Sequence, residues 1–172
     1  MKYLYLIRHA KSSWDEPFLS DHDRPLARRG RKAAPRVGAH MANMGWIPES
    51  VLCSSARRAV ETWDLVSMEL DQLIRTETTA DLYHASPSSI LDLLRALPDD
   101  EESVLLVGHN PTFEDLTLLL AVEGNQEALS DVKRKYPTGA LAVVDLPIDS
   151  WAQIRGGEGA LRAFIRPRTL GK

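Results

Sequence analysis

The 172-residue sequence contains one cysteine, Cys53, so a disulfide bond within the chain is impossible. It also lacks any apolar run approaching the roughly 20 residues that span a bilayer. The first residues carry one lysine and a short apolar run, without the longer apolar stretch and small-residue cleavage site of a signal peptide. From these absences we expect a cytoplasmic protein with no membrane partner.

The chain has no excess of positive charge either. Its 24 acidic residues outnumber its 21 lysines and arginines, which gives a formal net charge of −3. This balance argues against binding to nucleic acid or to an anionic membrane, so a site for an anion requires a local cluster of cations. At this length we expect one domain over residues 1–172, because each of two domains would have a thin core.

Short apolar runs that suit buried strands alternate with longer segments in which apolar residues recur at helical spacing. The predicted strands cover residues 3–7, 50–53, 77–79, 103–107, 140–146 and 163–166, and the predicted helices cover residues 26–44, 56–73, 87–97 and a segment after Pro111. Gly45 marks the end of the first helix, and Ser86 is the expected N-cap of the third. The pattern predicts an α/β protein, a three-layer α/β/α sandwich whose mostly parallel central sheet has an antiparallel edge strand.

Polar side chains follow three of the predicted strands directly. Arg8 and His9 follow the first strand, SSARRAVET with Arg58 follows the second, and Gly108-His109-Asn110-Pro111 follows the strand at 103–107. Ligands of open α/β sheets bind beyond the carboxyl ends of the strands. If the three strands are neighbours, we expect these side chains to converge on one spot.

Two arginines and two imidazoles gathered in this way would form a site for a phosphate group. The planar donors of a guanidinium match phosphate oxygens in pairs, and a helix that begins at Pro111 would direct its positive end toward the same anion. One neutral imidazole can attack phosphorus while a protonated one holds the oxygens. Fixed cations can supply the charge stabilisation that phosphoryl transfer needs, so we expect no cofactor and no metal.

Each motif alone has a simpler explanation. Arg8-His9 could be a surface feature, Asn110 could only cap a helix, and Arg58 could be solvated. We interpret Cys53 as a buried thiol, because nothing beside it in the sequence would activate it. The triplet Asp21-His22-Asp23 is read as a polar loop before Arg24 rather than as metal ligands. Only the combination of the arginine and histidine motifs in one order favours catalysis.

That order resembles the histidine phosphatase superfamily, also called phosphoglycerate-mutase-like. Arg8-His9 matches the Arg-His-Gly motif of the family with Ala10 in place of glycine, and Gly108-His109 matches its second histidine. Its Ser-x-x-x-Arg-Ala-x-x-Thr segment is matched by Ser54, Arg58, Ala59 and Thr62. The segments DHDRPLARRG, DLYHASP and KYPTGALAVVDL resemble the short bacterial phosphohistidine phosphatase branch. In this register the phosphate-binding arginine is Arg58 and not Arg57.

The resemblance implies a metal-independent hydrolase in which His9 becomes phosphorylated while Arg8, Arg58 and His109 hold the phosphoryl oxygens. The expected partner is a phosphorylated protein that carries phosphohistidine, so the expected process is protein dephosphorylation. A phosphomonoesterase that acts on a small phosphorylated substrate is the alternative, and a non-catalytic phosphate-binding module is a further one. The oligomeric state stays open.

Lys11, Asp15 and Asn110 are candidates for secondary roles at the site. Lys11 could add positive charge at the rim of the site, although a solvated lysine is the simpler interpretation. In an ungapped alignment with larger relatives, Asp15 takes the place of an asparagine that donates to phosphate. Because an ionised carboxylate cannot donate a hydrogen bond, we expect Asp15 to turn away from the site.

The sequence offers no clear match to the acidic residue of larger relatives. Alkyl esters need a proton donor because an alkoxide leaves poorly. In larger relatives a glutamate between the second arginine and the second histidine serves, whereas this chain offers Glu77, Asp81, Tyr83 and His84 there without a family motif. The lack of an acid favours a P–N substrate such as phosphohistidine, whose nitrogen base is easier to expel.

Overall fold

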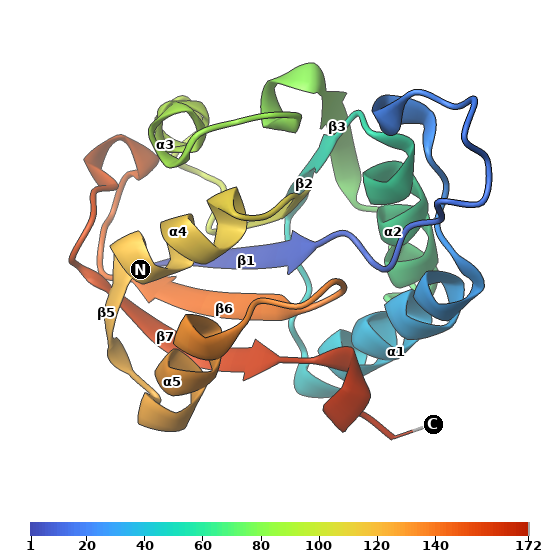
Figure 1. Cartoon of the computed structure of the whole chain (residues 1–172). Helices are drawn as coiled ribbons and strands as arrows, with labels where there is room; N and C mark the ends of the chain where they lie inside the picture. The colour runs from blue at the N-terminus through green and yellow to red at the C-terminus, as the bar shows by residue number, and fades with distance from the viewer. Residues whose placement is uncertain (172) are drawn as a thin grey trace.

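Seven strands form one sheet, and helices cover both of its faces (Figure 1). The computed structural model describes residues 1–171. The strands are β1 (Lys2–Arg8), β2 (Ser50–Ser54), β3 (Arg75–Thr79), β4 (Ser103–Gly108), β5 (Ala121–Gly124), β6 (Leu141–Leu146) and β7 (Gly159–Ile165). The helices are α1 (Arg28–Met44), α2 (Arg57–Met68), α3 (Pro87–Arg95), α4 (Thr112–Leu120) and α5 (Gln126–Arg134), with 3₁₀ turns η1 (Asp21–Asp23), η2 (Ala80–Leu82), η3 (Trp151–Gln153) and η4 (Pro167–Thr169).

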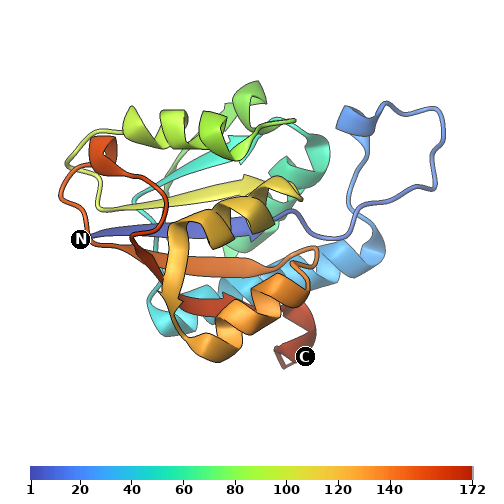
Figure 2. The same cartoon turned by 60° about the vertical axis from the view of Figure 1, so that its left-hand side comes forward.

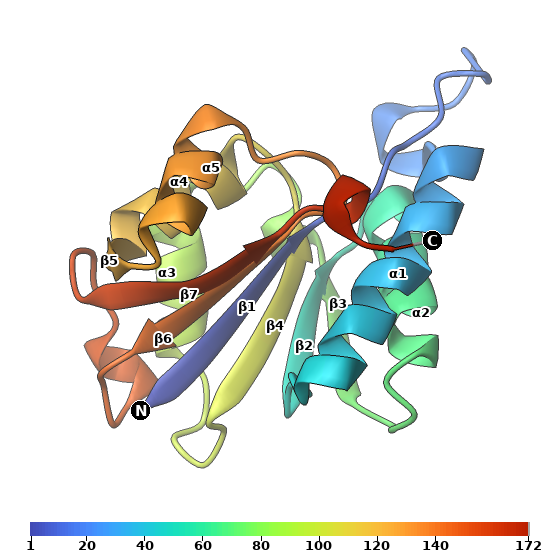
Figure 3. The same cartoon turned by 90° about the horizontal axis from the view of Figure 1, so that it is seen from below.

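Alternate residues of the central strands divide the apolar interior into two cores, one on each face of the sheet (Figure 3). Leu4 and Leu6 of β1 belong to the core beneath α3, α4 and α5, whereas Tyr5 and Ile7 belong to the core beneath α1 and α2. Successive side chains of a strand point to opposite faces, so a strand buried on both faces reads as a continuous apolar run. The predicted three-layer sandwich is confirmed.

The sheet is mostly parallel, with the strand order β3-β2-β4-β1-β6-β7-β5. Only β6 runs against its neighbours, β1 and β7. The expected antiparallel strand is therefore present, but it lies inside the sheet, and the edges are β3 and β5. The chain returns from β6 through η3 directly to the adjacent β7, and a direct return between neighbouring strands requires antiparallel pairing.

Most predicted elements are present with shifted ends. Gly45 ends α1 in the left-handed conformation, with a φ of 72°, and the Ser86 hydroxyl caps α3 by accepting from the Ser89 N–H. The helix expected to reach residue 73 ends at Met68 instead. β5 and α5 were not predicted: β5 has only four residues, whereas the buried Ala128, Leu129 and Val132 of α5 do lie at helical spacing.

Parallel pairing places the functional motifs at one end of the sheet. β4 lies between β1 and β2, and Arg8 is in register with Gly108, so the residues that follow β1 and β4 emerge side by side. The connection from β1 to α1 extends beyond this end of the sheet (Figure 2). The predicted neighbourhood of these three strands is confirmed.

Buried backbone contacts fix the start of this connection. The Ala27 N–H donates to the Lys11 carbonyl at 2.8 Å. Gly30 of α1 packs so closely that a Cβ atom there would collide with the same carbonyl. The helix thus holds the residue two positions after His9 through direct backbone packing.

Two further sequence-based expectations concern Cys53 and membrane-spanning helices. Cys53 is buried in β2, where desolvation raises the pKa of its thiol to about 12, in agreement with an unreactive buried thiol. Within residues 1–171, no helix combines the length and apolar character needed to cross a membrane.

Gly30→Ala should destabilise the fold by about 1–3 kcal/mol, because the added methyl group forces α1 and the Lys11 backbone apart. Urea denaturation measures the effect, and kcat/KM should fall with it, since the displaced segment follows His9. Gly171→Ala is the matched control, because nothing lies near a Cβ atom at that position. Equal stability of the two variants would contradict the packing argument.

Candidate active site

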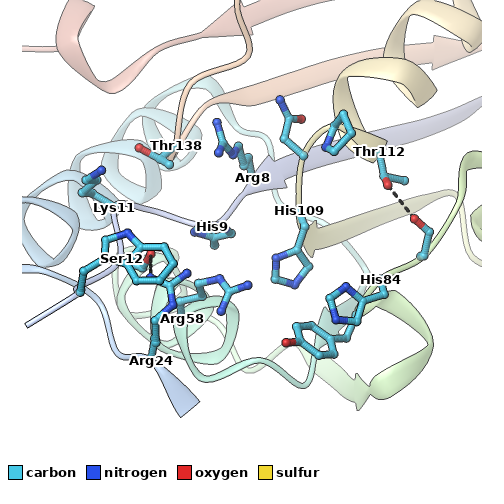
Figure 4. A pocket seen from close by; sticks show the side chains of 15 residues that line it. Arg8, His9, Lys11, Ser12, Arg24, Arg58, His84, His109, Thr112 and Thr138 are labelled. Carbon is cyan, nitrogen blue, oxygen red and sulfur yellow. Dashed lines mark hydrogen bonds between the residues drawn. The ribbon is translucent and has the colours of Figure 1, made fainter. Parts of the chain in front are cut away.

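Arg8, His9, Arg58 and His109 line one cavity of about 450 Å³ beyond the carboxyl ends of the parallel strands (Figure 4). β1 ends at Arg8, β4 ends just before His109, and Arg58 lies in the first turn of α2, which follows β2. The structure therefore brings together the four residues that the sequence analysis selected from three distant segments.

His9 is held as a neutral imidazole with one free nitrogen. Its Nδ1 lies 2.7 Å from the Ala10 carbonyl, which can only accept, so Nδ1 carries the proton and Nε2 keeps its lone pair. Burial lowers the pKa of His9 to about 3, and repulsion by His109, Arg58 and Arg8 acts in the same direction. The ring is therefore uncharged at neutral pH.

Ala10 fits the position that the family motif gives to glycine. Its φ is not positive, so the backbone does not need the freedom of glycine there. Its N–H donates to the Thr62 hydroxyl at 2.9 Å, and that hydroxyl donates to the Arg58 carbonyl at 2.7 Å. The residue after His9 is thus tied to the helix that carries Arg58.

His109 is the second imidazole of the site, and its ring centroid lies 5.2 Å from that of His9. Its Nε2 shares a hydrogen bond of 2.8 Å with the Ser54 hydroxyl. Burial, followed by repulsion from Arg58, lowers the pKa of His109 to about 4, so these groups alone keep it neutral at neutral pH. The expected protonated form of His109 requires a bound anion, whose charge would favour proton uptake.

The two arginines are oriented by acceptors outside the cavity. Arg58 donates from Nη1 to the Asp21 carbonyl at 2.7 Å and from Nη2 to its carboxylate at 3.0 Å, and Arg8 donates from Nη1 to the Tyr136 carbonyl at 2.8 Å. The Nε groups of Arg8 and Arg58 are buried without a protein partner. Both guanidinium groups therefore retain unmet donors beside the cavity.

Asp21 has a role that the sequence did not indicate. Its carboxylate accepts from the Tyr83 hydroxyl at 2.6 Å, from Arg58 and from Arg24 Nε at 3.2 Å. These bonds, the one from Tyr83 above all, hold the pKa of Asp21 well below its usual range. The Asp21–Asp23 triplet therefore forms a polar turn that orients arginines, and residues 1–171 contain no cluster of three or more metal-ligating side chains.

The remaining lining of the cavity combines polar and cationic side chains with apolar ones and includes no aspartate or glutamate. It is formed by Lys11, Ser12, Trp14, Arg24, Tyr83, His84, Ala85, Asn110, Pro111, Thr112 and Thr138. Arg24 stacks on Trp14, with its central carbon 3.5 Å from the ring centroid. His84 adopts a positive φ of 61°, which is uncommon outside glycine and typical of functional sites.

The secondary candidates differ in position. Lys11 and Asn110 line the cavity, and the Asn110 side-chain oxygen also accepts from the Glu114 N–H at 3.1 Å, so it caps the start of α4. Asp15 is exposed and is not part of the lining, as expected. Glu77 and Asp81 line a separate cavity beside α3.

Of the four candidates considered for a proton donor, Tyr83 and His84 line the cavity. Ser12 and Trp14, which lie within five residues of His9, could not be selected, because no spacing rule assigns them to the cavity. Thr138 reaches the site from the loop before β6. The one signal for Ser12 and Trp14 is their place in the segment that directly follows β1, whereas Thr138 lies before a strand and has no such signal.

Known proteins of one family are similar to this chain in sequence. The model of the histidine phosphatase superfamily (branch 1) matches residues 4–144. An uncharacterised Mycobacterium tuberculosis protein is 35% identical over 165 residues, which cover 94% of this chain and 100% of that protein. The match confirms the resemblance drawn from the motifs.

Solved structures extend the likeness to the short bacterial branch. The proposed phosphohistidine phosphatases SixA of Agrobacterium tumefaciens and Nakamurella multipartitia are 28% and 27% identical to this chain, with TM-scores of 0.79 and 0.81. Both comparisons cover 96% of this chain. They cover 98% of the Agrobacterium tumefaciens protein and 96% of the Nakamurella multipartitia protein. A proposed α-ribazole-5′-P phosphatase of Escherichia coli shares the fold at 17% identity and a TM-score of 0.67, with 99% and 98% coverage.

Arg58→Gln should lower kcat/KM by roughly 10²–10³-fold, because it removes buried donors that face the reacting group. Arg57→Gln is the matched control, since Arg57 is exposed and pairs with Glu61 outside the cavity. The control should retain activity within about threefold, because an exposed ion pair contributes little. Similar losses in both variants would contradict the assigned register.

Proton NMR should show that the rings of His9 and His109 remain neutral from about pH 8 to about pH 5, since both pKa values lie well below the ordinary 6.5. Inorganic phosphate should raise the titration midpoint of His109, because an anion between the arginines favours its protonated form. A midpoint near 6.5 for His9 in the ligand-free protein would contradict the neutral nucleophile.

Proposed function

This chain belongs to the histidine phosphatase superfamily, and we propose that it is a metal-independent phosphatase that removes the phosphoryl group from protein phosphohistidine. The observation that carries the proposal is the state of His9. Its ring is neutral, with Nδ1 bonded to a carbonyl and Nε2 free, in a cavity lined by cations and by no carboxylate. Such a ring is a nucleophile rather than an acid.

In the first step, the Nε2 lone pair of His9 attacks phosphorus and the bond from phosphorus to the leaving group breaks. The leaving group departs with the bonding electron pair, opposite to His9. Arg8 and Arg58 bind the equatorial oxygens, and His109 donates to them once the anion has raised its proton affinity. His9 becomes positively charged and phosphorylated, with its Nδ1 proton still bonded to the Ala10 carbonyl.

In the second step, water attacks the phosphorus of phosphohistidine, and the P–N bond to His9 breaks. The electron pair returns to Nε2, which restores the neutral ring, and inorganic phosphate leaves with the oxygen of water. The arginines stabilise charge on the same oxygens in both steps, so one set of fixed donors serves the whole cycle.

The lining of the cavity favours a nitrogen leaving group. A phosphorylated imidazole that carries a proton on its other nitrogen leaves as a neutral base, whereas an alkyl ester leaves as an alkoxide that needs a proton. The Tyr83 hydroxyl is committed to the Asp21 carboxylate, and burial, with that bond, raises the pKa of Tyr83. Because no aspartate or glutamate lines the cavity either, it lacks the carboxylic acid that could protonate an alkoxide.

His84 supports a second candidate, hydrolysis of a small phosphomonoester. It lines the cavity, and its ring lies 4.0 Å from that of Tyr83, close to His109. A protonated His84 could supply the proton that an alkoxide needs. His84→Asn would then abolish activity on alkyl phosphates while sparing phosphohistidine.

A phosphohistidine peptide should be hydrolysed with a kcat/KM at least about 100-fold above that of a simple alkyl phosphate, in the presence of a chelator, because no general acid serves the ester. His9→Ala should lower activity on the peptide by at least about 10³-fold. Urea denaturation of His9→Ala checks that the fold survives.

Two outcomes separate the parts of this proposal. A large preference for the alkyl ester would reject phosphohistidine as the substrate class and favour the small-molecule candidate. An active His9→Ala enzyme would reject the covalent mechanism itself.

A further inference from the structure

A second cavity, of about 610 Å³, adjoins the catalytic one and shares Lys11 and Thr138 with it. Eight of its thirteen lining residues are lysine or arginine, and one, Asp131, is acidic. In a chain of net charge −3, this concentration of positive charge is local. We call this cavity the basic groove.

One wall of the basic groove is a face of α1. Arg29, Lys32 and Arg36 follow one another at intervals of three and four residues, which places them on one side of the helix. α1 has no acidic residue, and cations in a first turn oppose the positive end of the helix dipole. Arg29, in the first turn, therefore lowers the stability of the helix slightly rather than raises it.

The other walls come from the end of α5, the segment after it, and the η4 turn, which lies beside α1 (Figure 3). Arg134 and Arg166 share Asp131 as an ion-pair partner, at 3.7 Å and 3.3 Å. Within residues 1–171, the α1 cations and Lys135 form no such pair. Ala33, Pro137 and Pro167 add apolar surface to the lining.

The basic groove lies next to the catalytic cavity, and Lys11 and Thr138 line both. Lys11 and Thr138 lie on the side of the catalytic cavity away from His84 (Figure 4). The Gly139 N–H lies 3.0 Å from the Arg8 carbonyl and 2.9 Å from the His9 carbonyl, so the loop that forms the boundary is fixed to the end of β1. A polypeptide with its phosphorylated side chain at His9 would reach the groove across this boundary, over Lys11 and Thr138.

We propose that the basic groove binds an acidic segment of the protein substrate next to its phosphohistidine. This inference rests on the proposed function and specifies that the substrate carries negative charge next to its phosphohistidine. The cations are spread over three elements instead of converging on one point, and they surround apolar surface, which suits aspartates and glutamates along a polypeptide rather than a single phosphate.

Binding is measured first with a fluorescent, unphosphorylated peptide whose central histidine is flanked by aspartate and glutamate. The variant is R29Q/K32Q/R36Q, and the control is K133Q/R155Q/R162Q, which removes the same charge outside both cavities. At low salt the groove variant should bind about tenfold more weakly than the wild type and the control, as expected for three lost ion pairs. Added salt should reduce that difference.

Turnover then links the basic groove to the reaction. On the phosphorylated acidic peptide, kcat/KM of the groove variant should fall about tenfold relative to the control, mainly through KM, and on phosphoramidate it should stay within about twofold. On a peptide with asparagine and glutamine flanks, wild type and groove variant should be alike. Thermal unfolding of the variant should occur at an equal or slightly higher temperature, because Arg29 no longer opposes the helix dipole and the three side chains form no ion pair within residues 1–171.

The two measurements separate the failure of this inference from that of the proposed function. If the wild type binds the acidic and neutral peptides equally, or binds a single-stranded oligonucleotide more tightly than the acidic peptide, the inference is overturned whatever the enzyme hydrolyses. Equal losses on the peptide and on phosphoramidate would also overturn it. If acidic binding depends on the groove but phosphohistidine is not hydrolysed, only the proposed function fails.

Discussion

The site depends on the burial of an uncharged imidazole among cations. His9 is 7% exposed and lies in one cavity with Arg8, Arg58 and His109, so protonation of its ring is opposed by both desolvation and repulsion. The Ala10 carbonyl fixes which nitrogen carries the proton. The same cations that keep His9 neutral are donors for an anion, so a single arrangement provides both the nucleophile and the phosphate site.

Sheet topology creates this arrangement. β1, β4 and β2 are adjacent and parallel, so the residues after each strand meet at one end. Contacts behind the cavity then fix the side chains: Asp21 holds Arg58, Ser54 holds His109, and Gly30 packs on the Lys11 backbone. The antiparallel β6 matters too, because the loop before it places Thr138 between the catalytic cavity and the basic groove, where it lines both.

Strongly apolar strands and complete motifs could be predicted from the sequence. YLYLI and SVLLV gave the central strands, and the arginine and histidine motifs gave the four residues that share the cavity. The position of β6 and the presence of the four-residue β5 depend on pairing that local pattern does not encode, whereas α5 has an N-cap and a helical apolar pattern that the prediction did not use. The role of Asp21, its hydrogen bond to Tyr83 and the basic groove were missed for a similar reason, since the partners lie tens of residues away in the chain.

Positive charge is concentrated at the two cavities. The catalytic cavity has no acidic lining residue and the basic groove has one, although acidic residues outnumber lysines and arginines in the whole chain.

The central claim, that His9 forms the covalent intermediate, is tested most directly by rapid quenching during turnover of phosphoramidate, followed by mass spectrometry under alkaline conditions. Phosphate on His9, absent without substrate, is the expected result. Rapid turnover with phosphate on another residue, or on none, would contradict the account.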